Sequence, residues 1–151
     1  MLNRLLALLF VFVLVPSCAL WSKIAPVVTQ VISAVADAIP IVETIAQWCD
    51  RHFSAAPDPV AQAKVDAALN RCRHELTLAT RAIQGDAEGV TREAALEGFR
   101  TAWGDLGATL RALPGVSPLL TAGASKGSLG LADQKTGETL SVPEPLAAEV
   151  E

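Results

Sequence analysis

Three stretches of the chain repeat apolar residues alternately four and three positions apart, and this pattern constrains the fold more than any other feature. Such spacing places the apolar side chains on one face of an α-helix. It predicts an all-α fold, an antiparallel bundle of about three amphipathic helices over residues 24–115. The apolar positions are Ile24, Val28, Val31, Val35, Ala38, Val42, Ile45 and Cys49, then Val65, Leu69, Cys72, Leu76, Ala79 and Ile83, then Leu96, Phe99, Trp103, Leu106, Leu110 and Leu113.

Residues that start and stop helices separate the three stretches. Residues 54–59 form a predicted turn, in which Asp58 is a suitable N-cap and the proline after it suits the first helical position. Residues 85–89 interrupt the second helix, and Thr91 is the predicted N-cap of the third. Pro40 lies inside the first stretch, so we expect it to kink or split that helix.

Composition agrees with a helical core. The chain has 151 residues, which is enough for one domain and an appendage. It is rich in Ala, Val and Leu and contains four Phe, three Trp and no Tyr, which favours close-packed helices over a β-sandwich. The net charge is −4, whereas nucleic-acid binding needs a clustered basic surface. We therefore expect no nucleic-acid partner.

The chain changes character after the third stretch. Residues 142–151 are acidic and contain proline, and the turn-like segment 133–137 is flanked by short apolar pairs that are compatible with a hairpin over 129–142. A lone hairpin is only marginally stable in water. We therefore expect residues 116–151 to form a flexible, largely disordered acidic tail.

Residues 1–17 have the pattern of an export signal. Arg4 supplies one positive charge, and Leu5 to Val15 is an unbroken apolar run that is too short to span a bilayer as a helix. The run ends at Val15-Pro16-Ser17-Cys18, which resembles the lipobox of bacterial lipoprotein precursors.

This resemblance implies that cleavage falls just before Cys18 and that this cysteine carries diacylglycerol and an amide-linked acyl chain. Several acyl chains together give stable membrane anchoring. Residues 18–23 are then the lipidated N-terminus and a spacer. Because Ala19 is not the aspartate associated with inner-membrane retention, the resemblance implies an outer-membrane location in the bacterial cell envelope, facing the periplasm. An uncleaved anchor and an ordinary secretory signal with a chance cysteine are the alternatives.

The two other cysteines, Cys49 and Cys72, form an even pair in an exported chain, so a disulfide between them is the leading prediction. If the first helix ran through Phe53, Cys49 would lie about 6 Å from the turn and Cys72 about 21 Å from it. This offset exceeds the Cα–Cα distance of about 7 Å that a disulfide can bridge. The bond therefore requires the first helix to end near Cys49. The alternative is a metal site that adds His52 and His74, although Cys72 and His74 are two apart and diverge on a helix.

The sequence contains no motif that indicates catalysis. It has no G-x-S-x-G element, and no glycine-rich phosphate loop follows a strand. We therefore expect no enzyme, no cofactor, no bound metal and no small-molecule substrate.

These features favour a small lipoprotein that is tethered in the envelope and acts as a structural or interaction component, with a protein partner there. The alternative is a membrane-active lysis or exclusion factor of a mobile element, in which Ile24 to Cys49 would lie at the membrane interface. Asp37 and Glu43 oppose a transmembrane helix, because a charged group near the bilayer centre costs about 2.5–3.5 kcal/mol. The alternative is disfavoured because surface-seeking helices tend to be basic, and this one is not.

Overall fold

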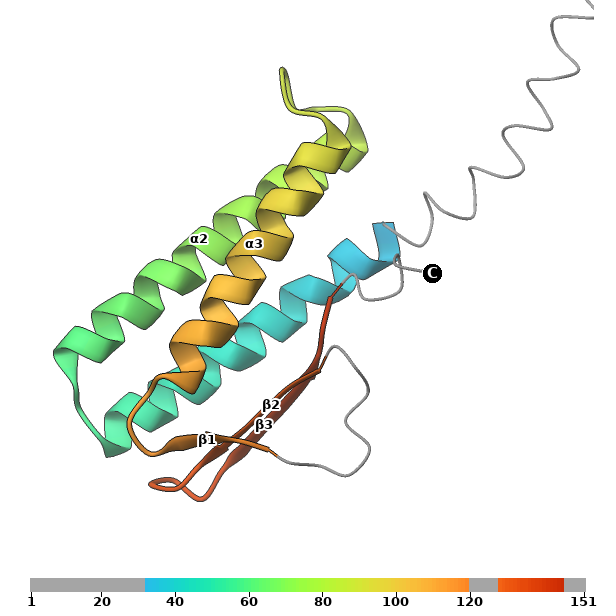
Figure 1. The fold of residues 1–151 in the computed structure, drawn as a ribbon. Helices are drawn as coiled ribbons and strands as arrows, with labels where there is room; N and C mark the ends of the chain where they lie inside the picture. The colour runs from blue at the N-terminus through green and yellow to red at the C-terminus, as the bar shows by residue number, and fades with distance from the viewer. Residues whose placement is uncertain (1–31, 120–127, 146–151) are drawn as a thin grey trace, which may run out of the picture. The chain divides into compact units, whose positions relative to one another are not determined.

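The computed structural model describes residues 32–119 and 128–145 (Figure 1). By its internal contacts the chain divides into two units, Met1–Ser33 and Ala34–Glu151. Of the first unit only Ile32 and Ser33 are described, so the predicted signal peptide (1–17), Cys18 and the spacer (18–23) lie outside the described residues. The architecture below is that of the second unit.

Three helices make up most of the described chain. The first, here named helix 32–55, spans Ile32–Ala55. It is followed by α2 (Pro59–Gln84) and α3 (Arg92–Arg111). The three predicted helices are therefore present, although the all-α class that was predicted from them is wrong, as the sheet described below shows.

Local sequence explains where α2 and α3 begin and end. Asp58 caps α2 as predicted, because its carboxylate accepts hydrogen bonds from the backbone N–H groups of Val60 and Ala61. Gly85 ends α2 with a φ of 82°, a left-handed conformation that favours glycine. Thr91 caps α3, also as predicted, by accepting a hydrogen bond from the N–H of Ala94.

Helix 32–55 continues through Pro40 without interruption, so the predicted split does not occur. Proline removes the hydrogen bond to the carbonyl four residues earlier, here that of Ala36. Both residues are exposed, which leaves that carbonyl open to water. The position of Pro40 on the outer face thus explains why the helix tolerates it.

By length and composition alone, helix 32–55 is apolar enough to cross a membrane, a test that core helices of soluble proteins also pass. Its apolar residues on one face are buried in the domain core, whereas Asp37, Glu43 and Asp50 are exposed on the other. The buried residues of this face are Val35, Ala38, Val42, Ile45, Trp48, Cys49, His52 and Phe53. The helix therefore has the amphipathic pattern of a core helix.

A three-stranded antiparallel sheet completes the domain, with strand order β1-β2-β3. The strands are β1 (Val116–Pro118), β2 (Ser128–Asp133) and β3 (Thr139–Pro143). The all-α prediction is wrong on this point, and so is the expectation of a largely disordered tail for the described residues 128–145.

The alternation of buried and exposed residues explains the sheet. Leu129 pairs with Val142 and Leu131 with Leu140, and all four are buried while their neighbours are more exposed. This two-residue period places the four side chains on one face of the sheet, which joins the helical core. A hairpin that buries such a face and gains a third strand escapes the marginal stability of a hairpin alone.

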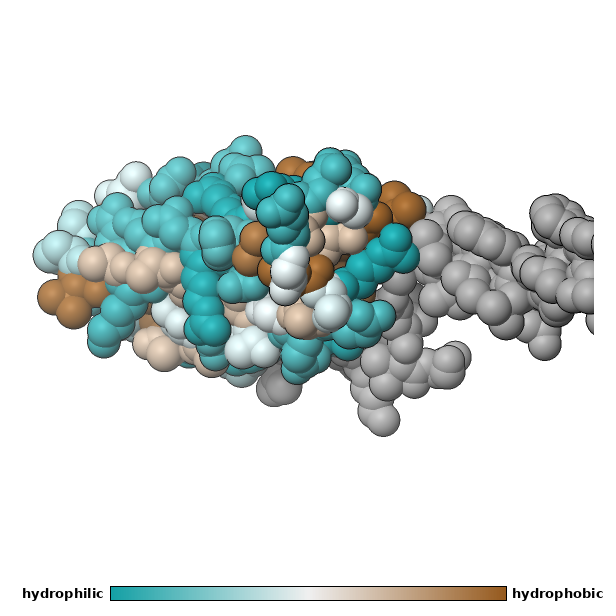
Figure 2. All heavy atoms as spheres, turned by 90° about the horizontal axis from the view of Figure 1, so that it is seen from above, coloured by the Kyte–Doolittle hydropathy of each residue, from teal (hydrophilic) through white to brown (hydrophobic). Residues whose placement is uncertain are grey.

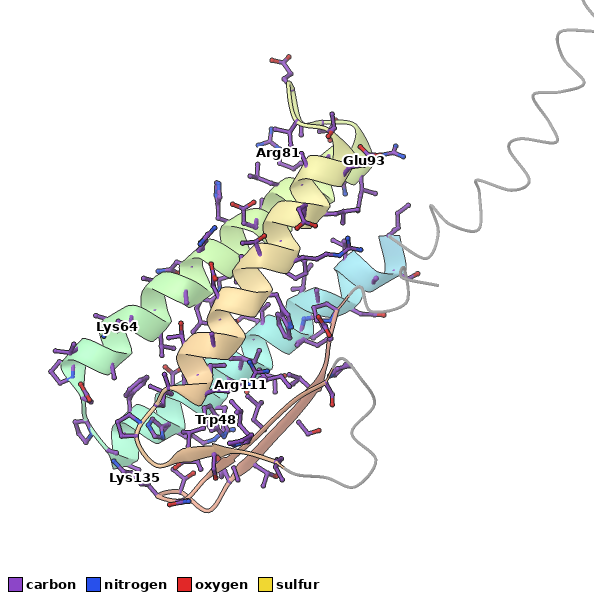
Figure 3. The ribbon with its side chains drawn as sticks, in the orientation of Figure 1. Trp48, Lys64, Arg81, Glu93, Arg111 and Lys135 are labelled. Atoms are coloured by element: carbon purple, nitrogen blue, oxygen red, sulfur yellow. The ribbon has the colours of Figure 1, made fainter. Side chains whose placement is uncertain are left out.

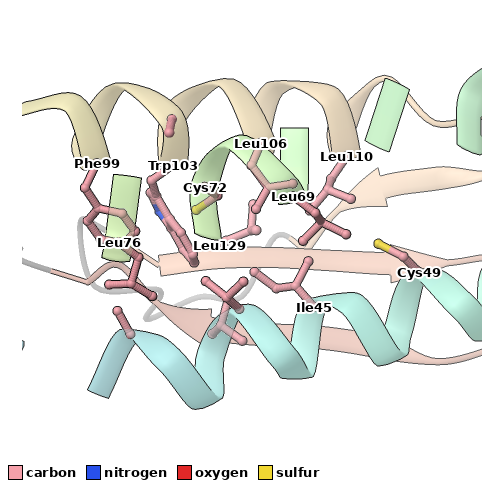
Figure 4. Packing of buried hydrophobic residues seen from close by; sticks show 14 of the residues in the cluster. Ile45, Cys49, Leu69, Cys72, Leu76, Phe99, Trp103, Leu106, Leu110 and Leu129 are labelled. Carbon is pink, nitrogen blue, oxygen red and sulfur yellow. The ribbon is translucent and has the colours of Figure 1, made fainter. Parts of the chain in front are cut away.

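A single apolar cluster connects the helices and the sheet (Figure 4). Phe99, Leu106 and Leu110 of α3 are completely buried in this cluster. Ile45 of helix 32–55 and Leu131 of β2 are also completely buried in it. The surface is mostly hydrophilic on the face that Figure 2 shows. Among the described residues, the exposed large apolar side chains are Ile32 and Ile39 on helix 32–55, Val60 on α2 and Val90 before α3.

The sheet's contribution to the core can be tested by replacing Leu131, which is completely buried on β2. Leu131→Ala is expected to lower the free energy of unfolding by about 2–5 kcal/mol, because it removes buried apolar surface and leaves a cavity. Urea denaturation followed by circular dichroism measures the change. Ser141→Ala, at an exposed position of β3, is the matched control and should change stability by less than about 0.5 kcal/mol. Equal effects of the two substitutions would contradict the packed sheet.

Candidate functional site

A buried polar pair joins helix 32–55 to the end of β2. The Nδ1 atom of His52 lies 2.7 Å from Oδ2 of Asp133, although the residues are 81 positions apart in the sequence. The two side chains are only 3% and 0% exposed. Buried polar groups require partners, so each side chain fixes the other.

The turn between β2 and β3 orients the Asp133 carboxylate for its contact with His52. Its carboxylate accepts hydrogen bonds from the backbone N–H of Lys135 (2.8 Å) and from the hydroxyl of Thr136 (2.9 Å). Gly137 completes the turn with a φ of 70°, which L-residues with side chains rarely adopt. The segment Asp133-Gln134-Lys135-Thr136-Gly137 thus folds around its own aspartate, an Asx-type turn.

The hydrogen bonds determine the charge of Asp133. Burial by itself raises the pKa of this carboxyl group, but the hydrogen bonds from His52, Lys135 and Thr136 outweigh burial and hold the pKa below its ordinary value. The carboxylate is therefore ionised at neutral pH and can only accept hydrogen bonds. It follows that Nδ1 of His52 carries the proton of the shared hydrogen bond.

Aromatic rings fix the plane of the His52 imidazole. The Trp48 ring stacks on it, with centroids 5.8 Å apart and planes inclined by 13°. Phe53 contacts it edge-on at a centroid distance of 5.1 Å. The indole Nε1 of Trp48 is buried and has no hydrogen-bond partner in the part of the chain that the structure describes, so Trp48 serves the site by packing. Figure 3 shows Trp48 where helix 32–55 approaches the sheet.

A second ion pair lies beside the buried one. Arg51 donates a hydrogen bond from Nε to the Glu138 carboxylate at 2.7 Å, and both side chains are partly exposed. Exposed ion pairs contribute little to stability, typically about 0.2–1 kcal/mol. The buried His52–Asp133 contact is therefore the stronger of the two links between the helix and the β2–β3 turn.

A cleft of about 410 Å³ opens beside His52 at the end of the domain where helix 32–55 leads into α2. Because Nδ1 is turned toward Asp133, the polar ring atom that His52 can present to this cleft is Nε2. No described residue other than Asp133 hydrogen-bonds the His52 ring. The cleft is lined by His52, Phe53, Ala56, Pro57, Asp58, Pro59, Ala61, Pro114 and Lys135.

The arrangement has defined chemical capacities. A histidine oriented by a buried carboxylate can exchange a proton through Nε2, donating a hydrogen bond when charged and accepting one when neutral. Asp58 and Lys135 add one negative and one positive charge to the lining. The lining that the structure describes includes no serine, threonine or cysteine side chain.

The predicted Cys49–Cys72 disulfide is not formed in this structure, where both cysteines are buried free thiols. Helix 32–55 ends at Ala55 instead of near Cys49, so Cys49 lies about 9 Å before its end, whereas Cys72 lies about 20 Å beyond the start of α2. This offset exceeds the Cα limit of about 7 Å for a disulfide. Figure 4 shows the two sulfur atoms at different levels of the core.

The alternative metal site is not assembled either. His74 is exposed on α2, whereas Cys72 is completely buried and His52 is held by Asp133. Among the described residues, no group of three or more His, Cys, Asp or Glu side chains is arranged to hold a metal ion.

Sequence patterns located part of this site. The sequence indicates His52 only as part of the metal alternative and Asp133 only as the first residue of a turn, and no sequence pattern connects the two. An aspartate at the first position of a turn that ends in glycine is a usable local signal. His52, the partner of Asp133, is 81 residues away, and no local sequence signal marks it as that partner. The predicted lipidation residue, Cys18, lies outside the described residues.

Comparisons with protein-family models, with curated proteins and with solved structures find no match to this chain.

The stabilising role of Asp133 can be tested by its pH dependence. Because its pKa is lower in the folded protein than in the unfolded chain, the ionised carboxylate stabilises the fold above the ordinary aspartate range. This contribution is lost as the pH falls through the folded-state pKa. Asp133→Asn is expected to lower the free energy of unfolding by about 2–4 kcal/mol near neutral pH. The difference from the unsubstituted protein should narrow below about pH 4 in urea titrations.

Asp105→Asn is the matched control for this substitution. Asp105 also pairs with a basic residue, Arg71 at 2.6 Å, but both side chains are 54% exposed. Its substitution should cost at most about 1 kcal/mol. A loss for Asp133→Asn no larger than that for Asp105→Asn would contradict a stabilising buried pair.

The state of the two thiols can be tested by their reactivity. Burial, together with the nearby carboxylates of Asp50 and Asp66, raises the pKa of Cys49 to about 12. Burial raises the pKa of Cys72 to about 11, although the charge of Arg73 acts in the opposite direction. Since the thiolate is the reactive form, both should react very slowly with a maleimide in the native protein. Both should react at once in denaturant without reductant. Failure of both to react in denaturant, with labelling restored by reductant, would instead demonstrate the disulfide.

Proposed function

We propose that this chain is a lipid-anchored protein of the bacterial cell envelope whose folded domain acts by binding, as a structural or interaction component. The observation that carries the proposal is the apolar run Leu5–Val15 followed by Val15-Pro16-Ser17-Cys18. An apolar run of this length suits a signal peptide, and the cysteine stands where lipoprotein precursors are cleaved and acylated. Ala19, which is not an aspartate, favours the outer membrane, facing the periplasm.

Tethering is the proposed mechanism. Acyl chains on Cys18 would confine the domain near one bilayer and raise its effective concentration for partners in the same compartment. A binding role of this kind needs a stable surface and an accessible recognition site. The packed core and the cleft beside His52 are consistent with both requirements.

The packing of helix 32–55 supports the binding role over the membrane-active alternative. Insertion at a membrane interface needs an available apolar face, and the apolar face of this helix is occupied in the domain core. Its exposed residues include Ile32 and Ile39, but also Asp37, Glu43 and Asp50, whose carboxylates do not favour an apolar or anionic membrane surface. Glu43 additionally pairs with Arg73 of α2 at 3.0 Å.

Mass spectrometry of the protein isolated from bacterial membranes tests the anchor. The expected mature chain begins at Cys18 and carries the mass of diacylglycerol and an additional acyl group. Metabolic labelling with a fatty acid should be abolished by Cys18→Ser. The matched control is Cys72→Ala, which removes a buried thiol and should leave the label unchanged.

Two results would contradict the lipid anchor and identify the alternatives. An intact leader that retains Met1 to Ser17 would indicate an uncleaved anchor. A cleaved chain with an unmodified Cys18 would indicate an ordinary secretory signal.

A further inference from the structure

The cleft beside His52 has a mixed polar and apolar lining, with a buried, oriented imidazole and a lysine at its edge. We propose that it binds a small organic carboxylate, with one carboxylate oxygen at His52 Nε2 and the other at Lys135 Nζ. This proposal deepens the binding role proposed above and rests on it for its biological setting. It departs from the sequence-based expectation that the chain has no small-molecule ligand.

The imidazole ring of His52 is held in one orientation. Its side chain is 3% exposed, its Nδ1 is bound to Asp133, and its ring is held between Trp48 and Phe53. The ring therefore cannot turn to satisfy Nε2 elsewhere. No described residue hydrogen-bonds Nε2, and this nitrogen is not among the fully buried atoms that lack a partner, so it keeps some access to solvent. A ligand in the cleft could therefore bond to it.

Lys135 provides the positive charge. It is exposed in the β2–β3 turn, and no described acidic side chain forms an ion pair with it. Its aliphatic chain lies across Gly115, where an added Cβ would come within 3.2 Å of the lysine Cε atom. Gly115 also has a φ of 84°, so two independent features favour glycine where the lysine passes.

The charged residues that line the cleft favour a ligand with a single anionic group. Asp58 is the acidic residue of the lining, and its Oδ1 accepts two N–H groups at the start of α2, where the helix dipole offsets negative charge. Those N–H groups are therefore not available to bind a phosphate as helix N-termini often do. The charged form of His52 and Lys135 together supply two side-chain donors, which match the two oxygens of a carboxylate.

The shape and place of the cleft define the rest of the ligand. Its volume of about 410 Å³ is in the range of small-molecule sites, and Phe53, Pro57, Pro59 and Pro114 suit an apolar body. The cleft lies at the Ala55 end of helix 32–55.

The proposed contact needs the charged imidazole, because only that form donates a hydrogen bond from Nε2 while Nδ1 donates to Asp133. The charged groups around the ring are Asp133 on β2, Asp58 before α2, Lys135 in the turn and Arg51 on the same helix, which is paired with Glu138.

The test is a titration of the full chain with benzoate in a nonionic detergent, followed by NMR of the histidine ring signals. The chain has two histidines, so the exposed His74 on α2 is an internal reference. We expect saturable shifts of the His52 signals with about millimolar affinity and no saturable shift of His74. Benzamide, which has the same shape without the charge, should bind at least about threefold more weakly.

A charge substitution at the edge of the cleft avoids unfolding the domain. Lys135→Met keeps most of the aliphatic chain and should weaken benzoate binding about three- to fivefold. Lys64→Met is the matched control, because Lys64 is exposed on α2 and does not line the cleft (Figure 3). Its affinity for benzoate should not change.

Three results would overturn the proposal: no saturable shift of His52, equal affinity for benzamide, or equal weakening by Lys64→Met and Lys135→Met. None of them bears on the lipid anchor, which the mass of the mature N-terminus tests separately. Conversely, an unmodified Cys18 would remove the proposed envelope setting and leave carboxylate binding to be judged by the titration.

Discussion

The hydrogen bond between His52 and Asp133 joins segments that are 81 residues apart and is almost completely removed from water. Both groups would be unfavourable in the core without the other, because a buried polar group that lacks a partner loses its hydration without compensation. The turn supplies Asp133 with two further donors, and the aromatic neighbours fix the ring of His52. The position of the β2–β3 turn on helix 32–55, and with it the cleft that includes Lys135, depends on this contact.

Helix 32–55 connects the two types of structure in the domain. Its apolar face contributes to the same core as α2, α3 and the sheet, and its polar residues pair in two directions, Glu43 with α2 and His52 with β2. The sheet is small, but its four buried side chains continue the helical core instead of forming a separate one. This shared core explains how a short hairpin, which would be marginal alone, forms part of a largely helical domain.

Local features of the fold could be predicted because they depend on neighbouring residues. The apolar spacing indicated the helices, and Asp58 and Thr91 were correctly identified as their caps. The hairpin over 129–142 was offered only as a possibility, because Leu129, Leu131, Leu140 and Val142 form two very short patterns. Its third strand and its place in the core were not predicted, because they depend on a helical surface elsewhere in the chain. The pairing of Cys49 and Cys72 was inferred from their number and their apolar faces, but the end of the preceding helix at Ala55 sets them at different levels.

The amino-acid sequence by itself determined the apolar leader that ends at Cys18, the amphipathic helices, their caps and the glycine-containing turn that begins at Asp133. These features follow from periodicity and from hydrogen bonds between residues a few positions apart. Only the tertiary structure decided that the sheet covers the core, that His52 meets Asp133, and that Lys135 lies at the edge of a cleft beside them. Such contacts arise from the burial of surfaces far apart in the sequence, and no local pattern specifies which surfaces meet.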